Sequence, residues 1–583
     1  MKNSLFLFIF SLILFACNKT GEVNYRTVTN NDPIQADDAV NTGDGTSNGS
    51  GNGSGTGSGN NGNQNLGDPL RVFQWHIENT GQSAFSTSGG TVGEDIGLSF
   101  SSPHKGSGIL VAVSDNGVQI THEDLSFNAL DGTHKNYFLS SPYSGDPSPS
   151  DDDAHGTAVA GIILATAENG KGGRGIAPNA SLAGLKFIGA SITTSKMIDQ
   201  ANGIYDIFNY SYGGYSCYTS TVPNSYLSQL EYGVNNLRNQ KGAIYVKAAG
   251  NEYYAPLEDC YEDIEGSAYY LGNAALEEDQ SYPYYILVGA LDADGKSAFY
   301  SSPGSSIWIS APGGDFGTSS PAIVTTDIMG CSNGYSKSDA TENDFESGGT
   351  LNSNCNYTST MNGTSSSAPM ISGVIAAMLS ANSNLTWRDV KYILASTARQ
   401  VDASSFSLNH PTGSNLTGHT YMRGWRTNGA GFKFHNWYGF GGVDADAAIS
   451  MASTYNSSWG AILKPSYESG SINLAIPDNS STGVSHQVNV SQNLTIEAVQ
   501  ITVNIDHNHI GDLGIELTSP SGTKSQLMLI NSGLIQEGMN NTVLLSNAFY
   551  MEPSQGQWTI KVLDGDPEVS GTLKNWSIKV WGH

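Results

Sequence analysis

The chain has 583 residues, of which 38% are hydrophobic and 14% charged, so it is long enough for two or more globular domains. Its 53 acidic residues outnumber the 26 lysines and arginines, which gives a formal net charge of −27. Such a surface repels nucleic acid and anionic membranes at long range, so we expect no nucleic-acid partner. The excess of acids also keeps an exported protein soluble and supplies oxygen ligands for calcium.

The first 66 residues predict export and tethering. An apolar run at residues 5–15 is too short to span a bilayer and ends at Cys17. This arrangement resembles a bacterial lipoprotein signal: residues 1–16 would be removed and Cys17 lipidated. An ordinary secretory signal is the alternative. Residues 17–66, rich in Gly, Ser and Asn, predict a flexible tether. We therefore expect an exported protein held by its lipid anchor alone to a bacterial membrane, the outer membrane, facing the periplasm or the exterior.

Four further cysteines predict two disulfides in an exported protein. They allow three pairings, and sequence proximity favours Cys217–Cys260 together with Cys331–Cys355. A zinc site is the alternative, but no CxxC pair or clustered histidine accompanies these cysteines.

From residue 67 to residue 455, expected strands and helices alternate as in an α/β fold. Continuous apolar runs, typical of strands in a parallel sheet, occupy residues 109–113, 243–249 and 285–289. Helical patterns occupy residues 155–166, 227–240 and 366–379. In such folds the functional side chains lie where strands end.

The last segment, residues 465–583, alternates apolar and polar residues between turns. Strands are expected at residues 488–490, 496–503, 514–518, 558–562 and 573–581. This pattern predicts an all-β sandwich after the α/β domain.

Three segments contain the residue types of nucleophilic catalysis. Asp115 ends an expected buried strand, His155 opens an expected helix (HGTAVAG), and Ser365 lies at a glycine-bearing turn into another helix (NGTSSSAP). A serine hydroxyl needs a histidine to take its proton and a carboxylate to orient that histidine. Each residue alone could be structural, as in an Asx turn or a helix start. In the order Asp, His, Ser they match subtilisin and not chymotrypsin or the α/β-hydrolases.

These segments resemble those of the subtilases, serine endopeptidases with a three-layer α/β fold around a parallel sheet. The resemblance implies a catalytic triad of Asp115, His155 and Ser365. It also implies that Asn251, which ends residues 248–251 (AAGN), donates its amide to the oxyanion, although Gly-Asn is also a common turn pair. The substrate-binding residues implied by the resemblance are Ser211, Tyr212, Gly213, Ala248, Ala249 and Gly250.

Within the family, the chain most resembles the kexin and furin branch, particularly its bacterial members. Residues 68–82 resemble the start of the catalytic domain in that branch, and residues 438–445 resemble its closing helix. The β-rich tail resembles the P domain, the β-sandwich that follows the catalytic domain there. The resemblance also implies a structural calcium ion with Asp124 and Asn169 as side-chain ligands, since hard oxygen donors suit that ion. Two solvated loop residues are the alternative.

The chain departs from the eukaryotic members that cleave after paired basic residues. Those members carry acids where this chain has Asn116 and near Ser216 and Ser302. An acidic cluster at residues 258–263 could instead line a pocket for arginine or lysine, or could be a solvated loop. We therefore expect a preference for basic P1 residues and no strict dibasic rule.

Subtilases usually carry a prodomain, and only the tether occupies that space here. Either a separate folding helper acts, or the P domain and calcium suffice. We expect protein or peptide substrates. The alternative functions are an inactive subtilase-like surface protein that serves as a binding or display module, a lipase or esterase, and a polysaccharide-binding protein. The chain lacks the GxSxG of an esterase and an identified carboxylate pair for cleaving sugars.

Overall fold

A computed structural model of the chain describes residues 67–583, except for residues 151, 214–217, 254, 257–268, 271, 406–415, 417, 457–458, 531 and 533. The predictions for residues 1–66, for the acidic cluster at 258–263, and for Cys217 and Cys260 lie outside the described residues. Within the described part of the chain, no helix has the length and apolar character needed to cross a membrane.

A seven-stranded parallel sheet lies at the centre of the first domain. Its strands, in spatial order, are β2 (Lys135–Asn136), β3 (Ser181–Lys186), β1 (Leu110–Asp115), β4 (Ile207–Tyr210), β5 (Ile244–Ala248), β8 (Tyr285–Leu291) and β9 (Ile309–Pro312). Every residue of β1, β5 and β8 is buried, as expected for strands covered on both faces. The three strands predicted from apolar runs are therefore confirmed within two residues at each end.

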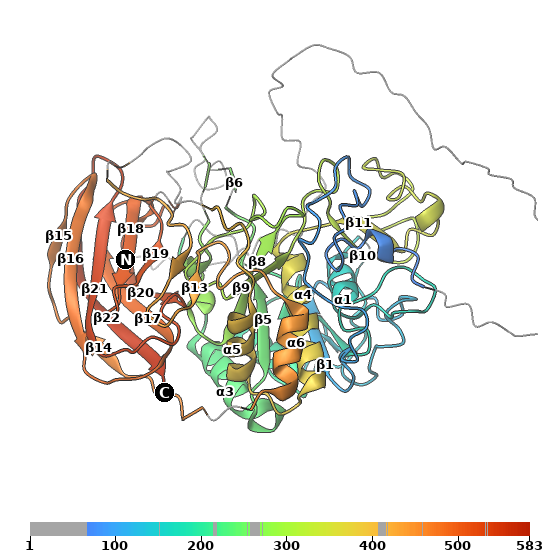
Figure 1. Ribbon diagram of the computed structural model, residues 1–583, viewed down its shortest axis with the longest axis horizontal. Helices are drawn as coiled ribbons and strands as arrows, with labels where there is room; N and C mark the ends of the chain where they lie inside the picture. Colours follow the sequence, from blue (N-terminus) through green and yellow to red (C-terminus); the bar gives the residue numbers. More distant parts are fainter. Residues whose placement is uncertain are drawn as a thin grey trace, which may run out of the picture. The chain divides into compact units, whose positions relative to one another are not determined.

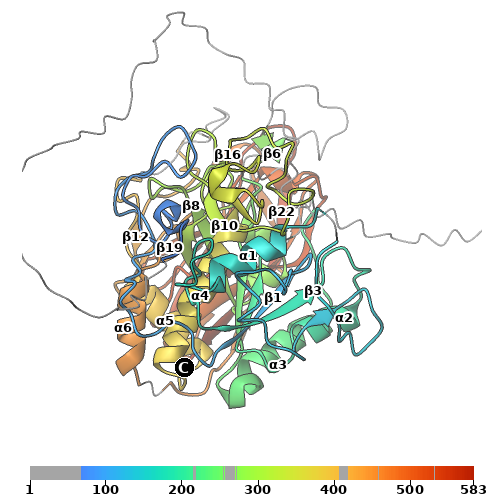
Figure 2. The same cartoon turned by 90° about the vertical axis from the view of Figure 1, so that its right-hand side faces the viewer.

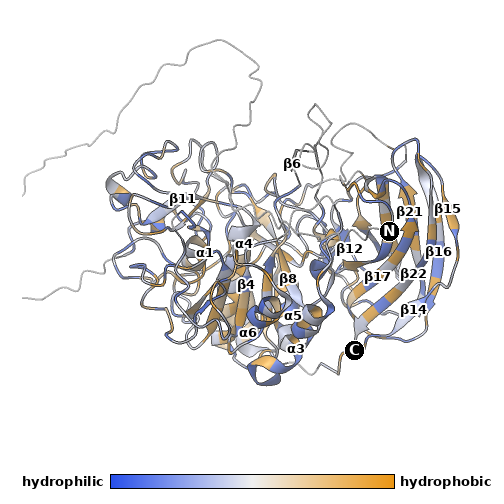
Figure 3. Cartoon of the chain, turned by 180° about the vertical axis from the view of Figure 1, so that it is seen from behind, coloured by the Kyte–Doolittle hydropathy of each residue, from blue (hydrophilic) through white to orange (hydrophobic). Residues whose placement is uncertain are grey.

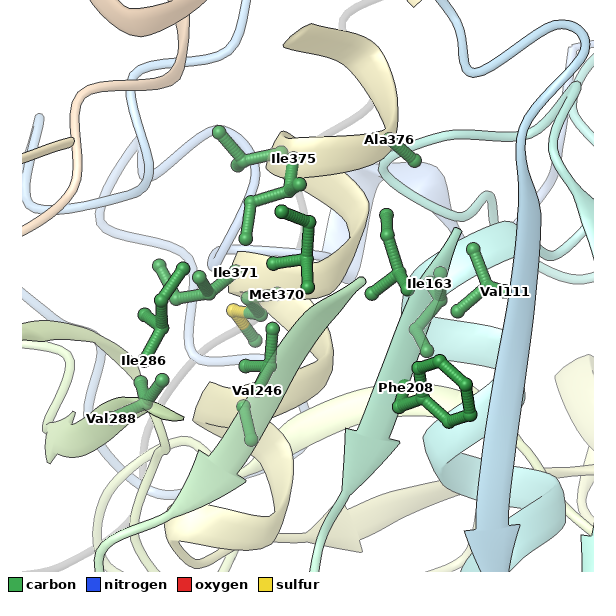
Figure 4. Packing of buried hydrophobic residues seen from close by; sticks show 14 of the residues in the cluster. Val111, Ile163, Phe208, Val246, Ile286, Val288, Met370, Ile371, Ile375 and Ala376 are labelled. Atoms are coloured by element: carbon green, nitrogen blue, oxygen red, sulfur yellow. The ribbon is translucent and has the colours of Figure 1, made fainter. Parts of the chain in front are cut away.

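Helices cover both faces of this sheet, because successive side chains of a strand point to opposite faces. Val246 of β5 lies against Met370 of α4 (Thr364–Ala381; Figure 4). Its neighbour Tyr245 lies against α3 (Asn224–Gln240), where a Cβ on Gly233 would come within 1.9 Å of the tyrosine oxygen.

The remaining helices divide between the two faces (Figures 1 and 2). Helices α1 (His155–Leu164) and α6 (Ala445–Thr454) pack with α4, and α5 (Trp387–Thr397) packs with α6, whereas α2 (Thr194–Gln200) packs with α3. The three-layer α/β fold is confirmed.

The predicted helix at residues 438–445 is wrong. Gly439 and Gly441 have φ angles of +59° and +146°, which a right-handed helix excludes. The segment instead runs beside β9, where Ser310 N donates to Gly441 O and Val443 N donates to Ser310 O, both at 2.9 Å. Helix α6 begins only at Ala445.

The second domain is a sandwich of two antiparallel sheets. One sheet contains β14 (Ser466–Glu468), β15 (Leu474–Ile476), β17 (Ile496–Asp506), β20 (Met539–Ser546) and β22 (Gly571–Gly582). The other contains β16 (Ser480–Val490), β18 (Leu513–Thr518), β19 (Lys524–Met528) and β21 (Gly556–Asp564). Hydrophobic and hydrophilic residues alternate along β17 and β22 (Figure 3), and Ile501, Trp558 and Ile578 lie in the shared core. The predicted sandwich is confirmed.

Three short strand pairs complete the described structure. They are β6 (Ala255–Pro256) with β7 (Tyr269–Tyr270), β10 (Ile323–Thr326) with β11 (Tyr357–Met361), and β12 (Arg426–Thr427) with β13 (Lys433–Phe434).

Candidate active site

Asp115 and His155 meet where β1 ends and α1 begins. His155 Nδ1 lies 2.8 Å from Asp115 Oδ1, and both side chains are buried. This approach depends on Gly156, because a Cβ there would lie 2.2 Å from the backbone oxygen of Gly117 and 2.8 Å from Cβ of Asp115. The glycine of the HGT sequence thus lets the first turn of α1 pack directly on the end of the strand.

The protonation chemistry of His155 is set by this contact. Burial disfavours the charged ring, but the Asp115 carboxylate outweighs burial and raises the pKa of His155 above its ordinary value. Asp115 Oδ1 accepts the proton on Nδ1, so the neutral ring keeps a lone pair on Nε2. Such a ring can accept a proton from a nearby hydroxyl.

Ser365 is the second residue of α4, whose preceding residue Gly363 has a φ of +95°. Ser365 Oγ donates a hydrogen bond to the Ser211 carbonyl at 3.0 Å, and Ser211 Oγ donates to the Ser365 carbonyl at 2.9 Å. The first N–H groups of a helix are unpaired and carry partial positive charge, which favours anions beside Ser365.

Strand register brings these residues to one edge of the sheet. Ser114 of β1 pairs with Tyr210 of β4, so Asp115 and Ser211, the next residues along, lie side by side. From β1 the chain crosses to β3 on one side and then to β4 on the other, which makes this edge a topological switch point. Ser211 is bonded to Ser365, so Asp115 and Ser365 converge on the same edge.

Asn251 follows β5 at the same edge, and Thr364 fixes its side chain. Asn251 Oδ1 accepts hydrogen bonds from both N and Oγ1 of Thr364, each at 2.9 Å. Nδ2 has no acceptor among the described residues, and it lies 3.2 Å from the position a Cβ would take on Gly363. The chain therefore holds an amide donor beside the start of α4.

The predicted substrate-binding residues lie beside two carboxylates that sequence reasoning missed. A Cβ on Gly250 would lie 2.3 Å from Glu252 Oε2, and a Cβ on Gly213 would lie 3.0 Å from Glu277 Oε1. The side chains of Ser211, Ala248 and Ala249 are buried, and Tyr212 donates to Gln200 Oε1 at 2.8 Å. Glu252 directly follows the AAGN sequence, and this adjacency is the one signal that could have identified it.

Ser302 donates from Oγ to Glu252 Oε2 at 2.9 Å. Burial raises the pKa of Glu252 to about 7, Glu277 adds to the rise, and Ser302 opposes it. Lys247 Nζ lies 3.2 Å from Glu277 Oε2, so Glu277 is already paired. Glu252 is therefore the carboxylate beside Gly250 that lacks a cationic partner among the described residues.

Asp124 and Asn169 lie together, and the structure adds Asp68 to them. Asn169 Nδ2 donates to Asp124 Oδ1 at 2.6 Å, while the Asp68 carboxylate accepts from the backbone of Glu168 and Asn169 at 2.9 and 3.1 Å. Asp124 Oδ2 is buried and has no hydrogen-bond partner in the described part of the chain. Burial raises the pKa of Asp124 to about 7. The hydrogen bond from Asn169 lowers this pKa, and the negative charge of Asp68 raises it further.

These oxygens fit a hard cation, because a buried carboxylate oxygen without a partner lies beside a second carboxylate. Within the described residues, no group of three or more His, Cys, Asp or Glu could hold a metal ion. A calcium ion here would therefore need backbone or water oxygens as well, which is usual for that ion.

Cys331 and Cys355 form a disulfide, the pairing that sequence proximity favours. It closes the segment between β10 and β11. Asn356, which follows Cys355, accepts a hydrogen bond on its backbone oxygen from Asp327 N at 2.8 Å.

Comparison with known proteins gives consistent matches over most of the chain. Residues 106–441 match the subtilase family, and residues 496–580 match the proprotein convertase P-domain. An extracellular serine protease of Aeromonas sobria is 35% identical over 88% of this chain and 91% of its own length. A microbial serine proteinase of Aeromonas salmonicida is 31% identical over 83% of both chains. The crystal structure of the Aeromonas sobria serine protease in complex with the chaperone ORF2 has a TM-score of 0.79 and 33% identity, covering 89% of this chain and 95% of that one.

Proposed function

This chain is a serine peptidase of the subtilase family with a C-terminal P domain, and we propose that it cleaves proteins internally through a triad of Asp115, His155 and Ser365. The hydrogen bond between Asp115 and His155, at the sheet edge where Ser365 also lies, carries the proposal.

The proposed reaction starts with His155 as general base. Nε2 takes the proton of Ser365 Oγ while Oγ bonds to the carbonyl carbon of the scissile peptide. Asn251 Nδ2 and the N-terminus of α4 stabilise the resulting oxyanion. Nε2 then gives its proton to the leaving amine, and the acyl-enzyme ester is hydrolysed by a water that His155 deprotonates in turn. The Ser365 hydroxyl must first rotate away from the Ser211 carbonyl, to which it donates here.

We propose that Glu252 sets a preference for basic residues at P1. Its carboxylate lies beside Gly250, a predicted substrate-binding residue, and a half-buried carboxylate without a cationic partner pairs well with guanidinium or ammonium. Glu277, which lies beside Gly213, adds negative potential, but its carboxylate already forms an ion pair with Lys247. The predicted acidic cluster at residues 258–263 is a second possible source of the same preference.

We also propose a structural calcium ion held by Asp124, Asn169 and Asp68. Asn169 would bind through Oδ1, which requires its amide to rotate because Nδ2 faces Asp124 in the structure. The ion would neutralise two neighbouring carboxylates and has no part in the peptide cleavage itself.

The other parts of the proposal concern folding and location. The Aeromonas sobria relative forms a complex with a chaperone, which supports a separate folding helper for this chain. Export is supported by the extracellular relative. Lipidation at Cys17, with attachment to the outer membrane, rests on residues 1–17 alone. Replacing Cys17 with serine should release the protein from membranes in a fractionation of the producing cells.

The test of activity is cleavage of a peptide library by the purified chain beside a Ser365→Ala control, together with labelling by a fluorophosphonate, which reacts with activated serines. We expect labelling and cleavage by the native chain and neither by the variant. A folded native chain that shows neither would favour the display-module alternative.

A further inference from the structure

A cationic recess lies between the two domains, away from the residues assigned above. It is lined by residues 423–436 of the peptidase domain and by residues 523–526 of the P domain, and it encloses about 350 Å³, part of which is open to solvent. Its lining includes Arg423, Arg426 and Lys524 and no carboxylate. In a chain with a net charge of −27, three cations around one recess are a marked local excess of positive charge.

The ion pairs beside the recess do not cancel this excess. Arg423 Nε lies 3.1 Å from Glu516 Oε2, and Lys524 Nζ lies 3.3 Å from Glu516 Oε1, so two cations share one carboxylate. Arg426 is exposed and has no ion pair among the described residues. Glu552 does not line the recess, and its carboxylate accepts hydrogen bonds from Gly429 N and two hydroxyl groups.

One residue of the lining, His435, carries a buried donor without an acceptor among the described residues. His435 is 2% exposed, and its Nδ1 accepts a hydrogen bond from Trp437 N at 3.0 Å. A neutral ring that accepts at Nδ1 carries its proton on Nε2. Nε2 is buried and has no partner among the described residues. Burial lowers the pKa of His435 to about 3, so the ring stays a neutral donor throughout the neutral range. A buried N–H group without an acceptor is costly unless a ligand or water supplies one.

We propose that this recess binds a single oxyanion group, a phosphate or a carboxylate. Arg426 and Lys524 supply charge at the exposed side, and His435 of the lining supplies a neutral donor that has no partner among the described residues. Guanidinium and ammonium groups form short, charge-assisted hydrogen bonds with such oxygens. The group could come from free inorganic phosphate or from an acidic side chain of another polypeptide, since both present the same oxygens.

The experiment is calorimetric titration of the full chain carrying Ser365→Ala, which prevents self-cleavage. Inorganic phosphate is titrated in one arm and a short acetylated, amidated peptide with one aspartate in the other, at constant ionic strength. Arg426→Gln and Lys524→Gln remove one cation each from the exposed side of the recess. Lys296→Gln is the matched control, because Lys296 is exposed, has no ion pair within the described residues and does not line the recess.

We expect at least one of the two probes to bind the parent chain and each recess variant to weaken that binding at least fivefold, with Lys296→Gln unchanged. Tighter binding of phosphate identifies a free ion as the ligand, and tighter binding of the peptide identifies a polypeptide carboxylate. The proposal is overturned if neither probe binds, or if Arg426→Gln and Lys524→Gln, with unchanged thermal unfolding, bind as the parent does.

Discussion

At the scale of single residues, Thr364 determines what Asn251 can do. Both polar groups of Thr364 donate to Asn251 Oδ1, so the amide can present only its Nδ2 side to a ligand. Thr364 Oγ1 also accepts a hydrogen bond from Gly250 N at 3.2 Å, which ties the proposed oxyanion donor to a predicted substrate-binding residue. An amide oriented in advance needs no reorganisation when negative charge develops beside it.

We predict that Asn251→Ala lowers kcat by roughly 10²–10³ with little change in KM, because the amide acts on the transition state and not on the bound substrate. Steady-state kinetics on one peptide substrate measures both constants. Ser365→Ala provides the baseline. A rise in KM with unchanged kcat would show instead that Asn251 contributes to binding of the substrate before the reaction.

Glu252 gives a prediction that depends on pH. Because its pKa is raised to about 7, the carboxylate gains its proton, and loses its charge, as the pH falls through 7. We expect kcat/KM for a substrate with arginine at P1 to fall more steeply below pH 7 than for a matched substrate with leucine. Glu252→Gln should remove that difference at every pH. Equal pH profiles for the two substrates in the native chain would mean that Glu252 does not recognise the basic P1 residue. The acidic cluster at residues 258–263 would then be the next candidate.

The proposed triad could be predicted from the sequence because its chemistry depends on residue type and order along the chain. Asp115, His155 and Ser365 each stand at a strand end or helix start that local pattern already locates. Glu252 and Asp68 have no such pattern: only adjacency to the AAGN sequence points to Glu252, and the role of Asp68 depends on neighbours far away in the sequence. Asp68, for example, meets the Asn169 backbone across 101 positions of the chain.

At the scale of elements, three segments are joined around Asp124. Asp68 accepts from the backbone of residues 168 and 169, Leu70 N donates to Gly172 O at 2.7 Å, and Asn169 donates to Asp124. The start of the peptidase domain is thereby held against two loops. Calcium at this point would stabilise all three segments, since an ion that binds only the folded state adds its binding free energy to folding.

We predict that chelation lowers the melting temperature more at pH 8 than at pH 5.5. Without the ion, folded Asp124 takes up its proton below about pH 7, whereas an unfolded aspartate does so only near pH 4. Protonation of Asp124 therefore favours the folded state in acid, and this contribution to stability is lost as the pH rises through 7. Calcium replaces the proton at higher pH. Scanning calorimetry with and without chelator measures the effect, and Asp124→Asn should abolish it. An equal shift in the variant would put the calcium elsewhere.

Sequence patterns located elements well where one physical signal dominated. Strands β1, β5 and β8 are apolar throughout because both of their faces are covered. The segment at residues 438–444 carries no such signal. Its path is set by backbone hydrogen bonds to Ser310, which no local pattern encodes.

At the scale of the whole molecule, the P domain makes buried contacts with the peptidase domain. Arg388 of α5 donates through Nε to Glu497 Oε2 of β17 at 2.7 Å, and His583 Nδ1 lies 2.9 Å from Glu497 Oε1. Asn547 Nδ2 donates to the Ser306 carbonyl at 2.7 Å. The contacts of Arg388 and Asn547 cross between the domains, whereas that of His583 lies within the P domain. The two crossing contacts support the hypothesis that the P domain stabilises its neighbour, and a chain ending near residue 455 should unfold at a lower temperature.

We predict that Arg388→Met lowers the free energy of unfolding by about 3–5 kcal/mol, because it leaves the buried Glu497 carboxylate without its main partner. The double variant Arg388→Met with Glu497→Met should recover part of that loss, since no unpaired charge then remains. Denaturant unfolding of the native chain, both single variants and the double variant measures the coupling. Additive losses would mean that the two residues act independently.

Lys391 makes the same junction sensitive to alkaline pH. Its Nζ donates to the Pro283 carbonyl at 2.9 Å and lies 3.9 Å from the ring centre of Trp308, with Glu497 in the surrounding cavity. Burial lowers the pKa of Lys391 to about 7, although Glu497 opposes the shift. An unfolded lysine keeps its proton to about pH 10.4, so between these values the unfolded chain binds more protons than the folded one.

The stability that Lys391 contributes should therefore rise with pH from about 7 to about 10. In this range the folded chain no longer carries the buried ammonium charge of Lys391, whereas the unfolded chain still does. Lys391→Met removes the titrating group at similar length. The melting temperature of the native chain, measured relative to that of Lys391→Met, should increase between pH 7 and pH 9. A constant difference across this range would mean that Lys391 stays charged in the folded protein, held by the Pro283 carbonyl and by Trp308 strongly enough to offset burial.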